Sequence, residues 1–98
     1  MRYDFHPEAS EEFHEAILYY AERDPALADS FIDAAQRAIQ QILDAPTRWG
    51  AFDEDVRRCL TRVFPYAILY TIEPEAILIV AVMHCSREPG YWKHRLRS

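Results

Sequence analysis

The sequence predicts an α+β fold of order β-α-α-β-β-β, with an antiparallel helical hairpin packed on one face of a mostly antiparallel sheet. Two observations predict it. Between Pro7 and Pro46 apolar residues recur at helical spacing, with one interruption at Asp24-Pro25. After Gly50 the apolar runs are short and take the two-residue period of strands, with a tight turn at Glu73-Pro74-Glu75. We therefore expect helices first and a sheet afterwards, in a single domain that spans residues 1–98.

A short strand and a first helix are expected at the N-terminus. Residues 2–6 alternate and include two aromatic side chains, as in a strand. Pro7 suits the first position of a helix, because its missing N–H would have no partner there. An apolar stripe at helical spacing follows, made of Ala9, Phe13, Ala16, Ile17 and Tyr20. Acidic residues crowd the first two turns, and those nearest the start suit the positive end of the helix dipole.

A second helix is expected from Asp24-Pro25, with Asp24 as N-cap and Pro25 at the first helical position. Its apolar face continues at the same spacing, through Leu27, Phe31, Ala35, Ala38, Ile39 and Ile42. Pro46 ends it, because the residue before a proline is biased away from helical geometry. Only a few residues join the two helices, so they should pack antiparallel.

Three strands are expected in the C-terminal half. Residues 56–63 read as one strand, and residues 64–72 as another, with Pro65 at a tolerated position near its start. Residues 76–83 are apolar on both faces, which suits a central strand. Residues 87–98 form a polar tail that contains aromatic side chains.

Charge is distributed unevenly along the chain. The net charge is −5, but residues 1–55 carry four basic and thirteen acidic residues, whereas residues 56–98 carry seven basic and three acidic ones. This asymmetry indicates an acidic helical side and a basic sheet side. Its simplest interpretation is two solvated faces; a basic contact surface is the alternative.

Standard catalytic and metal-binding motifs are absent from the sequence. It has no glycine-rich phosphate loop, no CxxC or HExxH motif and no nucleophile elbow, and its four histidines show no metal spacing. We therefore expect no cofactor, no metal and no small-molecule substrate. The longest apolar run, residues 76–83, is too short to span a membrane, and the N-terminus lacks a signal peptide. A cytoplasmic protein with reduced Cys59 and Cys85 and no membrane partner is expected.

Arginine and aromatic residues form the most suggestive set. Arg58 and Arg62 share one face of a predicted strand, and Arg57 points to the other. The tail adds further cations and rings, at Arg87, Tyr91, Trp92, Lys93 and Arg95. If the tail folds back beside the arginine strand, these groups gather on one surface. Arginine suits phosphate through its fork of donors, and aromatic rings stack on unpaired bases.

Each of these residues also has a structural interpretation. Arg57 or Arg58 could pair with Asp53, Glu54 or a helix acid. The aromatic side chains of Tyr66, Tyr70 and Trp92 are more often core or edge packing than base platforms. The pattern alone leaves both interpretations open.

Several short motifs in fixed order resemble one protein family. They are His6-Pro7-Glu8-Ala9, Tyr19-Tyr20, Pro46 before Trp49-Gly50, Val56-Arg57-Arg58, the run VFPYAILY at residues 63–70, and HCSREP at residues 84–89 with Tyr91-Trp92 and Arg95. Over nearly its whole length the chain resembles the RelE/ParE toxins, or plasmid-stabilisation proteins. The resemblance implies the toxin of a type II toxin–antitoxin system, inhibited by an antitoxin encoded beside it, and a RelE/ParE-like fold.

The resemblance leaves the target open. RelE-like members cleave mRNA in the ribosome, and ParE-like members inhibit DNA gyrase. The long hairpin and the FPY…Y strand are closer to the ParE branch, and the single lysine, Lys93, disfavours a ribosome-binding nuclease. We therefore expect a ParE-like toxin that inhibits gyrase by binding. An inactive partner-binding domain of the same fold is a third possibility.

The two target classes assign different roles to the predicted residues. In a nuclease, Arg58, Arg62 and Arg87 would stabilise charge as a ribose 2′-OH attacks phosphate, and Tyr91 would assist proton transfer. In a binding protein we expect partner contacts from the remaining set, Arg57, Trp92, Lys93 and Arg95. The antitoxin is expected to cover either the helical hairpin groove or the sheet edge.

Overall fold

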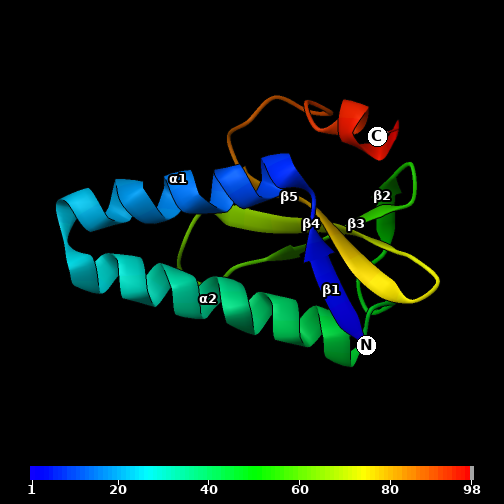
Figure 1. Cartoon of the computed structure of the whole chain (residues 1–98), viewed down its shortest axis with the longest axis horizontal. Coiled ribbons are helices and arrows are strands. Elements are labelled where there is room, and N and C mark those ends of the chain that lie inside the picture. The colour runs from blue at the N-terminus through cyan, green and yellow to red at the C-terminus, as the bar shows by residue number, and fades with distance from the viewer. Residues whose placement is uncertain (98) are drawn as a thin grey trace.

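The helices and strands occur in the predicted order. The computed structural model describes residues 1–97, with side chains as far as Leu96. Its elements are β1 (Arg2–Phe5), α1 (Pro7–Arg23), α2 (Pro25–Asp44), β2 (Ala51–Asp53), β3 (Val56–Leu60), β4 (Tyr66–Ile72), β5 (Ala76–His84) and a 3₁₀ helix, η1 (Lys93–Arg97). The hairpin of α1 and α2 extends to one side of the sheet (Figure 1). Both predicted helix starts and the three C-terminal strands are confirmed, but β3 ends at Leu60, so Arg62 and Val63 lie in the following loop and not in the predicted strand. β2 and η1 were not predicted.

Local capping explains where the helices begin and end. The side chain of His6 accepts a hydrogen bond from the Glu8 N–H at 3.1 Å, in front of Pro7 at the first helical position. Asp24 is the only residue between the helices: its N–H bonds the Tyr20 carbonyl, and its carboxylate accepts from the Ala26 N–H at 3.0 Å. One residue therefore ends α1 and starts α2. Among residues 1–97 no helix is long and apolar enough to cross a membrane.

The sheet has five strands in the order β1-β5-β4-β3-β2. Only β1 and β5 run parallel, so the sheet is mostly antiparallel, as predicted. Leu69 pairs with Ala81 and Tyr70 with Ile79, which leaves Val80 as an extra residue, a β-bulge, in the centre of β5. Because of this bulge, Val80 and Ala81 both pack on the same side of the sheet.

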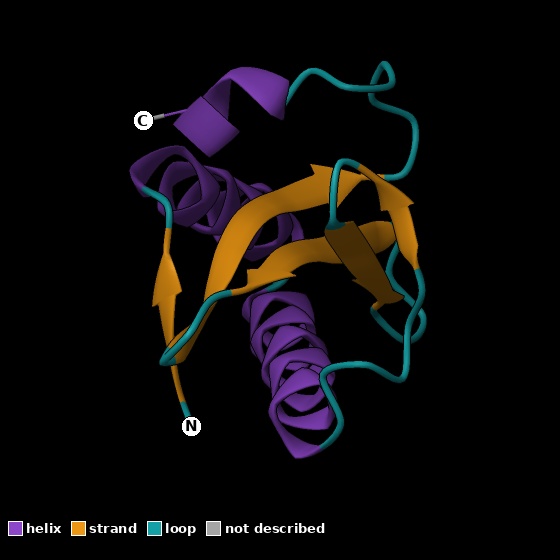
Figure 2. Ribbon diagram, turned by 90° about the vertical axis from the view of Figure 1, so that its right-hand side faces the viewer, coloured by secondary structure: helices purple, strands orange, loops and turns teal. Residues whose placement is uncertain are grey.

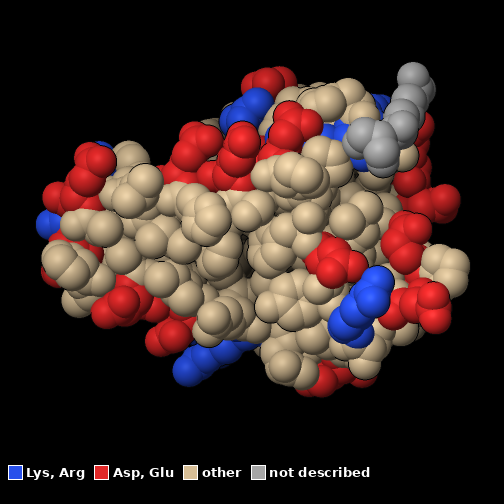
Figure 3. Space-filling model, in the orientation of Figure 1, with Lys and Arg blue, Asp and Glu red and all other residues tan. Residues whose placement is uncertain are grey.

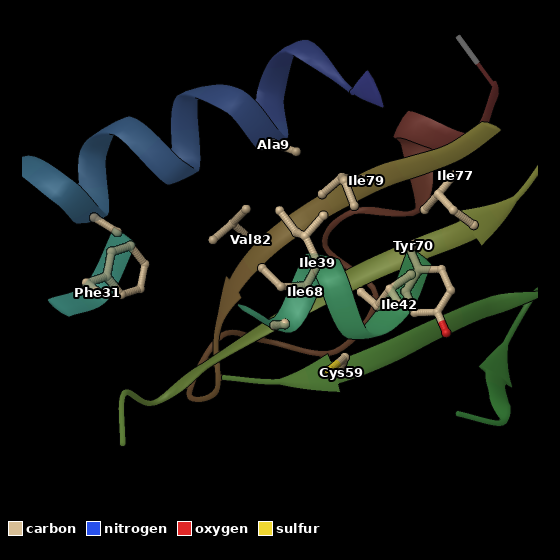
Figure 4. Close-up of a cluster of buried hydrophobic side chains, with 12 residues drawn as sticks. Ala9, Phe31, Ile39, Ile42, Cys59, Ile68, Tyr70, Ile77, Ile79 and Val82 are labelled. Atoms are coloured by element: carbon tan, nitrogen blue, oxygen red, sulfur yellow. The ribbon is translucent and has the colours of Figure 1, made fainter. Parts of the chain in front are cut away.

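The front face of the sheet packs against both helices. Figure 4 shows side chains from α1 and α2 meeting side chains of β3, β4 and β5. Phe31 of α2 is fully buried, and its ring lies 5.2 Å from that of Tyr20 and 5.4 Å from that of Phe64. The Tyr70 hydroxyl, also buried here, donates to the Pro46 carbonyl at 2.7 Å. Apolar area and satisfied polar groups together make this the larger core.

The back face has a smaller core of its own. Val56, Ala67, Leu69, Val80 and Ala81 lie in this core with Trp92, which is 1% exposed. We call residues 87–97 the C-terminal segment. Figure 2 shows α2 on one side of the strands and this segment, with η1, on the other. A short, largely irregular segment thus covers the back face.

Candidate interaction surfaces

A groove lies between α2 and the connection from β3 to β4. It encloses about 520 Å³, and we call it the α2 groove. Its lining comes from α2 (Leu27, Ser30, Asp33, Ala34, Arg37, Ala38, Gln41) and from the end of β3 and the following loop (Leu60, Arg62, Val63, Phe64). The front-face core supports it from below, because the Phe64 ring packs on Tyr20 and Phe31. The groove therefore lies directly on the front-face core.

The groove concentrates exposed apolar surface. Three of its lining residues are large apolar side chains that stay exposed: Leu27 at 39%, Leu60 at 61% and Val63 at 97%. Single exposed apolar residues are common on protein surfaces and need no explanation. Apolar side chains gathered in one concave place are typical of a surface that binds a partner.

Val63 is also strained. Its φ is +73°, in the left-handed region where a side chain costs about 1–2 kcal/mol and a β-branched residue is an outlier. The loop around it is tightly held, because the Thr61 hydroxyl donates to the carbonyls of Phe64 and Tyr66 at 3.0 and 3.1 Å. Strain held in place by its surroundings is concentrated at functional sites, which makes Val63 a candidate contact residue.

The groove borders an open sheet edge. β2 pairs with β3 only at Val56 and Arg57, so among residues 1–97 no strand flanks Arg58–Leu60 on that side. Such an edge can pair with an added strand. Two arginines and one acid, Arg37, Arg62 and Asp33, line the groove itself. The groove thus suits an extended segment that carries apolar and acidic side chains.

Acidic side chains lie over both helices. Figure 3 shows them over α1 and along the lower edge of α2, with a broad uncharged band between the two helices. The predicted acidic helical side is therefore visible on the folded surface.

The three arginines assigned to a nuclease do not gather at one point. The Arg58 guanidinium lies over the Phe52 ring at 5.0 Å, and Arg62 lines the α2 groove. Arg87 lies over the Tyr91 ring at 3.8 Å and pairs with Glu88 at 3.1 Å. The tail does fold back, as Phe52 packs on Trp92. Each of the three cations has different contact partners.

Tyr91 and Arg95 are bound to an acid of α1. The Tyr91 hydroxyl donates to Glu12 Oε2 at 2.6 Å, and Arg95 donates to both Glu12 oxygens at 2.8 and 3.1 Å. We call these three residues the Glu12 clasp. Burial, then the hydrogen bond to Glu12, raises the pKa of Tyr91 far above its ordinary value, so its phenol keeps its proton. Burial opposes the charge on Arg95, but the hydrogen bond to Glu12 holds its pKa above the ordinary value.

The residues assigned to partner binding divide into two groups. Trp92 and Arg95 are 1% and 5% exposed, so no partner can reach them while the C-terminal segment is docked. Both side chains instead hold the C-terminal segment against the sheet, where it covers the back face. Arg57 is half-buried and donates to the Trp49 carbonyl, and Lys93 pairs with Asp53 at 3.1 Å at the surface. Of the four, Lys93 is the most accessible.

Sequence reasoning missed Glu12 and Val63. Glu12 was one of several acids in the first helical turns, and helical spacing alone does not show that one of them faces the sheet. Val63 was read as the end of a strand, because β-branched residues favour strands.

No group of three potential metal ligands occurs among the described residues. Burial raises the pKa of the Cys59 thiol, which disfavours the nucleophilic thiolate form.

Comparison with known proteins gives concordant matches. The family described as "ParE toxin of type II toxin-antitoxin system, parDE" matches residues 3–89. Toxin ParE2 of Mycobacterium tuberculosis, from two strains, is 32% identical over 89 residues, which cover 87% of this chain and 82% of the relative. A solved structure titled "Chromosomal ParDE TA system from P. aeruginosa" has a TM-score of 0.74 at 11% identity, over 86% of this chain and 95% of that one. The last match supports the fold alone.

Proposed function

We propose that this chain, which belongs to the ParE toxin family of type II toxin–antitoxin systems, inhibits DNA gyrase by binding and performs no chemistry of its own. Membership of the family makes the chain a toxin with an antitoxin as its partner. The target and the binding faces are the further steps proposed here, together with a cytoplasmic location.

The dispersal of the nuclease set supports a binding mechanism. RNA cleavage needs cations and a proton-transfer group around one phosphate. Here Arg58, Arg62 and Arg87 have separate neighbourhoods, and Tyr91 holds its proton against Glu12. The net charge of −5 also disfavours approach to ribosomal RNA, because long-range charge steers association. Inhibition by contact requires none of these groups to converge.

A supercoiling assay tests the target. Purified toxin at micromolar concentration should inhibit purified gyrase, and equimolar antitoxin should restore activity. No inhibition under these conditions removes gyrase as the target. Primer extension on translated mRNA provides the alternative: codon-linked cuts that disappear in Arg62→Ala or Arg87→Ala would indicate a RelE-like nuclease instead. A chain that binds its antitoxin but leaves growth unimpaired would be an inactive partner-binding domain.

The antitoxin's binding face is proposed to be the α2 groove. The occupant is an extended antitoxin segment with apolar anchors over Leu60 and Val63 and an acidic side chain at Arg37 or Arg62. Its backbone would extend the sheet at the open part of β3. Charge supports this assignment, because an acidic segment is attracted by the groove arginines and repelled elsewhere by the acids over the helices.

Two exposed leucines provide a matched test of that face. Leu60 lies in the groove and Leu18 on α1, and both are 61% exposed. Leu60→Asp should weaken binding of the antitoxin encoded by the adjacent gene by roughly 30-fold or more, as truncated hot spots do. Leu18→Asp should leave the affinity unchanged. If Leu60→Asp and Leu18→Asp change the antitoxin affinity equally in a calorimetric titration, the antitoxin binds another face. That outcome would leave the result of the gyrase assay unaffected.

A further inference from the structure

Strand β1 forms one edge of the sheet. It pairs with β5 on one side, and among residues 1–97 no strand flanks its other side. Figure 2 shows β1 as the outermost strand. The His6 N–H bonds the Ile79 carbonyl of β5 at 2.9 Å, and successive residues of a strand direct their backbone N–H and C=O groups to alternate sides. The N–H and C=O groups of Tyr3 therefore point away from β5, toward the open side.

The side chains of β1 carry opposite charges at two alternate positions. Arg2 Nε lies 3.5 Å from Asp4 Oδ2, and the two side chains are 74% and 59% exposed. An ion pair this exposed contributes little to stability, so each partner can exchange it for another at small cost. Tyr3 points to the opposite face, where its ring lies 5.9 Å from that of Phe5 and stays 40% exposed. The strand thus offers open backbone groups, two charges and a partly exposed ring.

This pattern is complementary to itself. In an antiparallel pair centred on Tyr3, the two copies of Tyr3 would exchange both of their backbone hydrogen bonds, because these groups point outward. Arg2 of each chain would then lie opposite Asp4 of the other, in the positions where cross-strand side chains approach most closely. The same register places the two Tyr3 rings on the helix side of the sheet, where Phe5 stacks on Phe13.

We propose that β1 is a self-association edge, at which two copies of this chain pair antiparallel through Tyr3 and join their sheets into one. Local charge identifies a second copy as the occupant, because Arg2 and Asp4 are the only charged side chains of β1 and would satisfy each other twice across a two-fold axis. Lysine and proline commonly block pairing at sheet edges, and β1 contains neither.

The net charge of −5 opposes any association of two copies at long range. At physiological ionic strength salt screens exposed charges beyond about 8 Å, whereas the Arg2–Asp4 contacts act within the interface. The strand contributes only four residues from each chain, which is at the low end of interface sizes, so the dimer is a transient one. The inference depends neither on gyrase as the target nor on the face that the antitoxin covers.

Exchanging the two charges tests the second copy directly. Arg2→Asp and Asp4→Arg each place like charges opposite one another in a homodimer, so each should raise the dissociation constant at least roughly 10-fold. An equimolar mixture of the two variants restores both ion pairs and should dimerise as the unaltered chain does. Sedimentation velocity up to roughly 0.5 mM chain measures this, because a small interface needs high concentration. An unaltered chain that stays monomeric, or a mixture no tighter than its components, would overturn the proposal.

A backbone variant tests the register. Tyr3→Pro removes an N–H that the sheet of one chain does not use, so the monomer should fold while the dimer is lost. Tyr3→Ala keeps that N–H and should weaken the dimer less. Leu60→Asp, in the α2 groove, should leave it unchanged. Circular dichroism checks the folding of each variant. A dimer that survives Tyr3→Pro, or one that is lost in Leu60→Asp, lies on another surface and contradicts the proposal.

Discussion

The two faces of the sheet are covered in contrasting ways. On the front, α1 and α2 bury a continuous apolar core centred on Phe31, whose ring contacts aromatic side chains of both α1 and the sheet. On the back, the C-terminal segment buries one large ring, Trp92, and is fixed by polar bonds to Glu12. The helices are held on the front face mainly by buried apolar area, whereas the C-terminal segment is held on the back face by a few hydrogen bonds with defined geometry.

The difference indicates which cover can be released. Area-based packing is lost only when the helices separate from the sheet, which is close to global unfolding. A short segment held by a few polar bonds can open alone, at a fraction of that free energy. The α2 groove is on the side covered by the helices, and Trp92 on the side covered by the releasable segment.

Removing the centre of the front core should have the largest effect. Phe31→Ala leaves a cavity among closely packed rings and should lower the free energy of unfolding by about 3–5 kcal/mol. Urea unfolding followed by circular dichroism measures it. Leu18→Ala, at an exposed position, should change the value by less than about 0.5 kcal/mol. Similar values for the two would show that the front core is not the main source of stability.

The back cover should show strong pairwise coupling. A double-mutant cycle of Glu12→Gln and Arg95→Met should give a coupling energy of about 2–3 kcal/mol, because either single change leaves a largely buried group without its partner. The exposed pair Arg87 and Glu88 should couple by less than about 0.5 kcal/mol. Denaturant curves for both cycles provide the comparison. Coupling as weak in the first cycle as in the second would remove the clasp as an anchor.

Relief of the backbone strain at Val63 should raise the stability of the fold and lower its affinity for the antitoxin. Val63→Gly accepts the φ of +73° without a side-chain clash and should stabilise the fold by up to about 1 kcal/mol. The same change removes an apolar anchor, so antitoxin affinity should fall. Thermal unfolding and a titration on one preparation measure both. A destabilised variant would mean that the loop makes use of the valine side chain.

The smallest effect should be a pH dependence at the surface. The hydrogen bond from His94 lowers the pKa of Glu8 below its ordinary value of 4.5. A lowered pKa in the folded state gives stability that is present above pH 4.5 and is lost as the pH falls through the lowered value. His94→Ala should therefore narrow the difference in melting temperature between pH 6 and pH 3. An unchanged difference would contradict this assignment.

The sequence predicted the fold far better than the contact residues. Both helices begin at the predicted residues because capping and proline geometry are local. β2 is three residues long and pairs across a turn at Glu54 and Asp55, which both have positive φ, so no period could indicate it. The bulge at Val80 and the choice of Glu12 among several acids depend on three-dimensional packing. Trp92 and Arg95 were assigned to a partner because charge and aromaticity look alike in clasps and in binding sites.

The junction at Asp24 constrains how this chain can change in length. Because a single residue separates the helices, the hairpin has no slack. One inserted residue would rotate the following helix by about 100° and turn its apolar side away from the strands. Insertions are better placed between Thr47 and Arg48, which are exposed, because the flanking Pro46 and Trp49 carbonyls accept hydrogen bonds from Tyr70 and Arg57.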